Sequence, residues 1–223
     1  MSGLADELRA ASAGEWRRMQ THPFVVAVEE DRLPPAVLRR YLVNEHAFVE
    51  TAIAIFGYAL AKAPGMEERR GLARIVAGLA EEQVPYFSAA FARLGVEPAV
   101  WRDAALPPRA AMLRDGMLGY AAHGGFADIV AAMLAAEWTY ATFCTRAAAR
   151  PISDPVLREW IALHAAEPFL AQAQWLRETL DRLGADADAA TRRRLASVFA
   201  TALALEIEFH HAPFDAPAPA IPA

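Results

Sequence analysis

Three glutamates interrupt apolar helical stripes in separate parts of the sequence. Positions three and four apart share a helix face, and Glu45, Glu137 and Glu206 each fall on a face made largely of Ala, Leu, Phe, Tyr or Ile. Burial can raise the pKa of an unpaired carboxyl by about 3–5 units. Such a group protonates, binds a cationic or hydroxyl partner, or lines a wet pocket. Carboxyls of unequal pKa are what general acid–base catalysis requires. We expect the three glutamates to share one pocket and to serve such catalysis there.

Each glutamate also has a purely structural interpretation. Glu45 could form a buried salt bridge or cap a neighbouring helix, and Glu137 could reach solvent at the edge of its face. Arg146 lies nine residues after Glu137, too far round the helix to pair with it. One such carboxylate is often structural, whereas three on separate helices favour a shared pocket.

The histidines and the single cysteine give weaker signals. His46, His164, His210 and His211 invite a metal site, but the Glu-x-x-His pair of helical di-metal centres does not occur. HExxH, CxxC and the phosphate-binding loop motif are also absent. We therefore expect no metal and no cofactor. A lone thiol such as Cys144 is more often a small apolar filler than a nucleophile.

The elements that must position these residues are all helical. Ala, Leu, Arg and Glu dominate, and alternating β-branched runs are absent, which predicts an all-α fold of about seven or eight helices. Prolines and glycines divide the chain, with kinks expected at Pro85 and Pro168. The predicted helices span residues 4–20, 24–30, 34–64, 66–94, 109–122, 126–149, 154–183 and 189–211. We expect one domain over residues 1–213 and a proline-rich tail over 214–223.

Composition narrows the classes of function. The chain has 223 residues, 55% hydrophobic and 22% charged, with a net charge of −5, which is typical of a globular protein. The arginines are dispersed, so a nucleic-acid surface is not expected. No basic segment followed by an apolar core opens the sequence, and charges interrupt every long apolar run. We expect a cytoplasmic protein without a membrane partner.

Five segments, in order, resemble the motifs of the TenA/thiaminase II family, which has the haem-oxygenase-like helical fold. Trp16 followed by "HPFV" resembles the family's W…HPF segment, and "LRRYLVNEHAFVE" resembles F-x-x-Y-L-x-Q-D-Y-x-F-L. "GGFADIVAAMLAAEWTYA", "LREWIALHAAEPF" and "LEIEFHHAPF" resemble its later motifs. Together these segments span nearly the whole chain.

The resemblance places family roles on particular residues. It assigns the catalytic glutamate to Glu206, and it places Ala136 where the family has its nucleophilic cysteine. A methyl group cannot replace that thiol. Phe48, His164 and Leu113 stand where the family has tyrosines. The substrate-binding positions that we carry over are Glu45, Phe48, Tyr140, His164 and Phe209.

The cysteine-less branch of the family is the best match. The resemblance implies hydrolysis of amino- or formylamino-pyrimidines from thiamin breakdown to hydroxymethylpyrimidine, and it implies a homotetramer. Glu137 would act as base or proton shuttle and Glu206 as the complementary acid, while Glu45 holds the ring amine and nitrogen. Tyr140 would add a hydroxyl. The alternatives are a non-catalytic small-molecule-binding protein and an oxidase or oxygenase on the same fold.

Overall fold

The computed structural model describes residues 3–102 and 105–215. These residues form twelve α-helices and one π-helix, and no strand occurs among them. The prediction of an all-α fold is confirmed. The elements are α1 (Leu4–Ala11), α2 (Ala13–Gln20), α3 (Pro23–Glu29), α4 (Pro35–Lys62), α5 (Met66–Gly78), the π-helix η1 (Leu79–Gln83), α6 (Val84–Leu94), α7 (Pro98–Trp101), α8 (Pro108–His123), α9 (Phe126–Ala148), α10 (Pro155–Ala165), α11 (Glu167–Gly184) and α12 (Ala189–Asp215).

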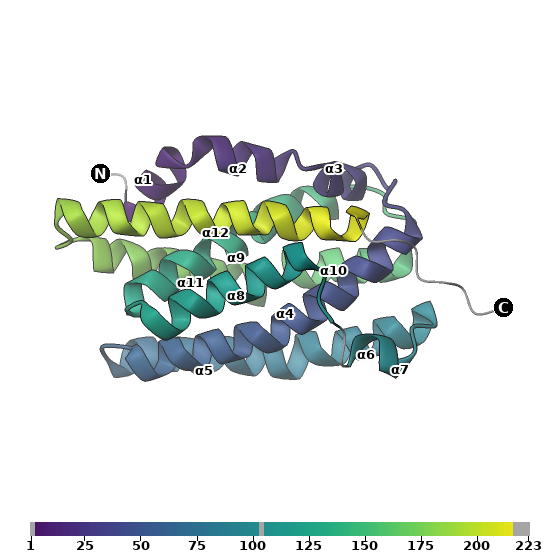
Figure 1. Cartoon of the computed structure of the whole chain (residues 1–223), viewed down its shortest axis with the longest axis horizontal. Coiled ribbons are helices and arrows are strands. Elements are labelled where there is room, and N and C mark those ends of the chain that lie inside the picture. The colour runs from purple at the N-terminus through teal and green to yellow at the C-terminus, as the bar shows by residue number, and fades with distance from the viewer. Residues whose placement is uncertain (1–2, 103–104, 216–223) are drawn as a thin grey trace.

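Helix α9 lies at the centre of the bundle. It packs against α10, α11 and α12, and more lightly against α4, while α12 also packs against α8 and α4. Figure 1 shows α12 running along the length of the molecule, with α1 to α3 on one side and α8 and α4 on the other. Three long helices from distant parts of the chain, α4, α9 and α12, therefore meet in the interior.

The observed helices are shorter and more numerous than the predicted seven or eight. The predicted helix 4–20 is divided at Ser12, and the predicted helix 154–183 is divided at Ala166, whose backbone is extended. Pro168 lies in the first turn of α11, where its missing N–H has no helical partner to lose. The chain between residues 95 and 107 contains the short helix α7. These breaks leave the fold class unchanged.

The predicted kink at Pro85 takes the form of a π-helix. Proline lacks an N–H and its ring crowds the carbonyl four residues earlier. The turn before Pro85 widens into η1, which inserts the extra residue without ending the helical path. Helices α5, η1 and α6 consequently continue one another along one side of the bundle (Figure 1).

Local interactions fix one end of each of two helices that carry site residues, α9 and α12. The Asp128 carboxylate accepts the N–H of Gly125 at 2.8 Å and so caps the start of α9. Helix α12 continues to Asp215, which pairs with Arg109 at 2.6 Å. Phe214 and Asp215, which we had placed in the tail, therefore belong to the helix, and residues 216–223 lie outside the described part of the chain.

Candidate active site

All three glutamates are buried in the interior of the bundle. Glu45 on α4, Glu137 on α9 and Glu206 on α12 are 4%, 8% and 1% exposed. Burial raises the pKa of each to about 8. The charge of Glu137 raises the pKa of both other carboxyls further, and that of Glu45 raises the pKa of Glu206. These effects place Glu137 within electrostatic reach of Glu45 and of Glu206, and Glu45 within reach of Glu206.

Glu45 is held by donors from two helices. Trp160 Nε1 donates to its Oε2 at 2.6 Å, and the Tyr41 hydroxyl donates to its Oε1 at 3.2 Å. His164 Nε2 lies 3.6 Å from the same Oε1. The bonds from Trp160 and Tyr41 lower the pKa of Glu45, although burial dominates and the net shift is upward. The orientation of this carboxyl is therefore fixed by the protein.

Glu206 has no such donors. Neither of its carboxyl oxygens has a hydrogen-bond partner among the residues that the structure describes. The neighbouring His210 Nδ1 lies 2.8 Å from the Glu206 carbonyl oxygen and 3.7 Å from Oε2. Burial, together with the charge of His22, lowers the pKa of His210 to about 3, so its ring is neutral and Nδ1 carries the proton toward the carbonyl. His210 Nε2 is then an acceptor, and it too lacks a partner.

Aromatic rings surround the carboxyls. The hydroxyls of Tyr41 and Tyr140 are 2.9 Å apart, and the Tyr140 ring lies 5.4 Å from His164. Phe209 lies 5.8 Å from the Tyr41 ring and 6.1 Å from the ring of Phe48. The structure thus brings together all five residues that the sequence analysis placed at the substrate. Low polarity in this shell explains why the carboxyls hold their protons so strongly.

Glu137 faces the interior and not solvent. The side-chain amide of Gln172 on α11 lies close enough to lower its pKa slightly against the dominant effect of burial. Arg146 is engaged elsewhere, donating to Glu29 at 2.8 Å and to Gln20 at 2.7 Å. Among residues 3–102 and 105–215 no arginine forms an ion pair with Glu137, which agrees with its raised pKa.

Comparison with known proteins identifies the architecture. Residues 9–215 match the TENA/THI-4/PQQC family. The chain belongs to this family. An aminopyrimidine aminohydrolase from Halalkalibacterium halodurans is 24% identical over 87% of this chain and 88% of its own. Another from Bacillus subtilis is 22% identical over 92% and 87%. A TenA family transcription regulator from Silicibacter sp. TM1040 superimposes with a TM-score of 0.89 at 20% identity, covering 96% of this chain and 98% of that chain, and shares the haem-oxygenase-like fold.

This TenA family member has no thiol beside its carboxyls. Ala136, at the position where the resemblance places a cysteine, is 4% exposed. Cys144 is fully buried, and burial raises its pKa well above the usual value, so it stays a neutral thiol. Leu113, where the resemblance places a tyrosine, is also fully buried and apolar. The polar side chains described in this site are therefore carboxyls, the hydroxyls of Tyr41 and Tyr140, and the rings of His164 and His210.

Two residues of the site escaped the sequence analysis. Tyr41 is one of them, although a spacing of four residues on one helix brings it within reach of Glu45. Trp160 is 115 residues from Glu45 in sequence, and no local pattern pairs them.

Within residues 3–102 and 105–215 no group of three or more His, Cys, Asp or Glu is arranged to hold a metal ion. No helix in the same ranges is long and apolar enough to cross a membrane.

Proposed function

We propose that this protein is an aminopyrimidine hydrolase of thiamin salvage that works by carboxylate acid–base catalysis without a thiol nucleophile. The observation that carries the proposal is the set of three buried carboxyls with pKa values raised to about 8, of which Glu137 raises the pKa of the other two. Family membership and the names of two relatives, both aminopyrimidine aminohydrolases, support the substrate class.

The reaction needs a base and an acid at once. Conversion of an aminomethylpyrimidine follows R–CH2–NH2 + H2O → R–CH2–OH + NH3, in which water loses a proton and the departing nitrogen gains one. Coupled carboxyls lose their protons one at a time because each charge opposes the next. Near neutral pH the site therefore holds protonated carboxyls together with a minority ionised one. We assign Glu137 as the base and Glu206 as the acid.

Substrate orientation is assigned to Glu45 and its surroundings. A protonated carboxyl offers one donor and one acceptor, which matches the ring nitrogen and amino group of an aminopyrimidine. Trp160 and Tyr41 fix the direction of that carboxyl, while Phe48 and Phe209 provide apolar ring surface. Tyr140 contributes a hydroxyl, and His164, whose pKa burial lowers to about 4, contributes a neutral ring.

The proposal is tested with purified protein and two substrates. Incubation with aminomethyl- and formylaminomethyl-pyrimidine should yield hydroxymethylpyrimidine, detected by liquid chromatography and mass spectrometry, and E206Q should abolish most of it. Absence of both turnover and pyrimidine binding, measured by calorimetry, would refute the proposal. The homotetramer and the cytoplasmic location implied by the resemblance belong to the same proposal, and analytical ultracentrifugation tests the former.

A non-catalytic binding protein is the second candidate. Ala136 stands where the resemblance implies a thiol, and Leu113 stands where it implies a hydroxyl. Both residues are apolar and buried. Pyrimidine binding that persists without turnover in the assay above would select this alternative.

A further inference from the structure

A groove of about 640 Å³ lies on one side of the bundle. Helix α5 and the π-helix η1 form one wall, and the end of α10 with α11 forms the other. Both walls depart from regular helix here, with η1 on one side and the break at Ala166 on the other. π-Helical turns occur frequently at functional sites.

The floor of the groove touches two residues of the site. Phe169 lines the groove, and its ring lies 4.8 Å from that of His164. Gln172 also lines the groove, and its side-chain amide acts on Glu137. One layer of side chains therefore separates the groove from the buried carboxyls.

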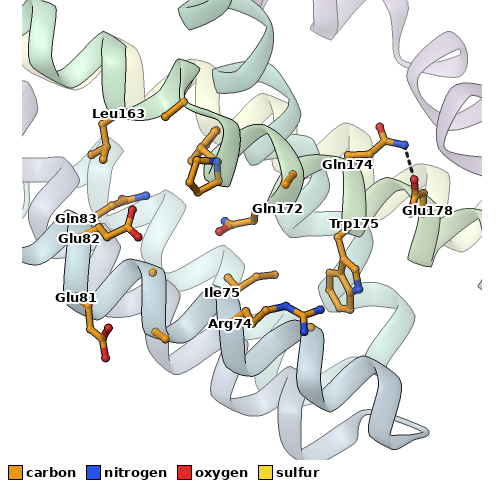
Figure 2. Close-up of a pocket in the computed structure, with 17 residues that line it drawn as sticks. Arg74, Ile75, Glu81, Glu82, Gln83, Leu163, Gln172, Gln174, Trp175 and Glu178 are labelled. Carbon is orange, nitrogen blue, oxygen red and sulfur yellow. Dashed lines mark hydrogen bonds between the residues drawn. The ribbon is translucent and has the colours of Figure 1, made fainter.

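Gln172 is an unusual residue for such a position. Figure 2 shows its side chain extending from α11 into the groove, toward the segment that carries Glu82 and Gln83. Its amide nitrogen is inaccessible to solvent and has no hydrogen-bond partner of normal geometry. A buried donor without a partner is costly, at about 1–3 kcal/mol. Such a donor is satisfied when a ligand or a tightened contact with Glu137 supplies an acceptor.

We infer that this groove is the route by which small molecules reach the carboxyl site, and that Gln172 is a positioning residue for Glu137 at its inner end. The route follows from the ring contact between Phe169 and His164 and from the position of Gln172 in the groove lining, since this residue also lowers the pKa of Glu137. Only the identity of the passing molecule, a neutral or protonated aminopyrimidine, rests on the proposed function.

Two glycines give a matched test of the route. Gly78 lines the groove, Gly57 lies on the exposed side of α4, and an added Cβ would meet no atom within 4 Å at either position. G78W should fill the groove, whereas G57W should only change the surface. The probe is diisopropylcarbodiimide with an amine trap at pH 6, where a pKa of about 8 keeps Glu137 protonated and reactive. Peptide mass mapping then gives the rate at which Glu137 is modified.

We expect G78W to slow modification of Glu137 at least fivefold and G57W to change it less than twofold. Equal rates in the two variants, or no modification of Glu137 in the unaltered protein, would overturn the route. Turnover of aminomethylpyrimidine by the same proteins separates the two proposals. If G78W blocks modification while the unaltered protein neither binds nor hydrolyses any pyrimidine, the route stands and the proposed function fails.

Gln172 is tested by the titration of Glu137. Because its amide lowers the pKa of Glu137, Q172A should move the titration midpoint upward in carboxyl ¹³C NMR of the glutamate-labelled protein. Q174A is the matched control, since Gln174 lies two residues along α11 and donates to Glu178 instead. An unchanged midpoint in Q172A, or an equal shift in Q174A, would refute the assignment of Gln172.

Discussion

The two ends of the carboxyl site differ in how many hydrogen bonds the protein provides to the carboxyl group there. At one end Glu45 accepts hydrogen bonds from Trp160 and Tyr41. At the other end both carboxyl oxygens of Glu206 and the Nε2 of His210 have no partner. Both regions are equally buried, so exposure does not explain the difference.

Glu45 is therefore held in one orientation by hydrogen bonds, whereas Glu206 is not. Most buried polar atoms in folded proteins are hydrogen-bonded, and each exception needs an explanation. The bonds to Glu45 hold its geometry whether or not a ligand is present. Glu206 keeps its donor and acceptor capacity free, which is what a proton donor to a substrate requires. Under the proposed function, the stability lost at the Glu206 end leaves this carboxyl free to exchange a proton with substrate.

Removing the carboxyl function at the unsatisfied end should have the largest effect. E206Q keeps the size of the side chain but cannot exchange a proton, so we expect kcat to fall about 10²–10⁴-fold. KM should change little, because Glu45 still orients the ring. Steady-state kinetics measures both, and circular dichroism checks the fold. A fall of less than threefold would contradict the role of Glu206.

Weakening the satisfied end should have a smaller effect on turnover. Y41F removes one donor to Glu45 and the contact with the Tyr140 hydroxyl without leaving a large cavity. The pKa of Glu45 should rise, because this bond lowers it. We expect pyrimidine affinity to weaken about tenfold, equivalent to about 1.4 kcal/mol, with kcat affected less than KM. Calorimetric titration with hydroxymethylpyrimidine provides the measurement, and unchanged affinity would count against the binding role of Glu45.

Because Glu206 is buried without hydrogen bonds to its carboxyl group, the free energy of unfolding should depend on pH. The pKa of Glu206 is raised to about 8 in the folded protein, and an unfolded glutamate has a pKa of about 4.3. Below the lower value both states are protonated; between the two values only the unfolded chain releases its proton. Stability contributed by Glu206 is therefore lost as pH rises, by up to about 1.4 kcal/mol per pH unit.

The E206Q variant isolates this effect. Because glutamine does not titrate, the unfolding free energy of E206Q relative to the unaltered protein should increase from pH 5 to pH 7.5. Urea denaturation at the two pH values measures the difference. A difference that stays constant with pH would show that Glu206 titrates normally. Buried histidines make the stability depend on pH in the opposite direction. Burial lowers the pKa of His164 to about 4, whereas an unfolded histidine has a pKa of about 6.5. The unfolded chain therefore binds a proton first as pH falls below about 6.5, and stability is lost.

Adding a hydroxyl at position 48, where the resemblance places a tyrosine, should have the smallest effect. Phe48 is half-buried and packs against Phe209. F48Y adds a donor that reaches the ring of a bound pyrimidine, and we expect KM to fall about two- to threefold, or about 0.5 kcal/mol. Thermal denaturation should show little change. A tenfold loss of activity would mean that the apolar surface at this position is required.

The fold was predictable from sequence because helix formation is largely local. The apolar periodicity, the prolines and the capping residues mark most helices, and α9 begins within the predicted boundary through Asp128. The divisions at Ser12 and Ala166, the short helix α7 and the widening at η1 depart from the predicted helices. The break at Ala166 and the widening at η1 lie beside prolines. Both depend on how proline-containing turns pack against neighbouring helices, which periodicity does not encode.

The site was predictable in part, for the same reason. Three carboxylates on apolar faces were visible as violations of an amphipathic pattern, and such violations mark functional positions. Their partners were not visible, because the bonds of Trp160 to Glu45 and of Tyr41 to Tyr140 join residues from distant helices. The free oxygens of Glu206 follow from what surrounds it in space, and no sequence pattern contains that information.

The most direct test of the coupled carboxyl site is the titration of Glu206 in the unaltered protein and in E137Q. Carboxyl ¹³C NMR of glutamate-labelled protein gives the midpoint in each. We predict a midpoint near pH 8 in the unaltered protein and a lower one in E137Q, because removal of the Glu137 charge makes ionisation of Glu206 easier. A Glu206 midpoint between pH 4 and 5, or one that E137Q leaves unmoved, would contradict the existence of a shared site.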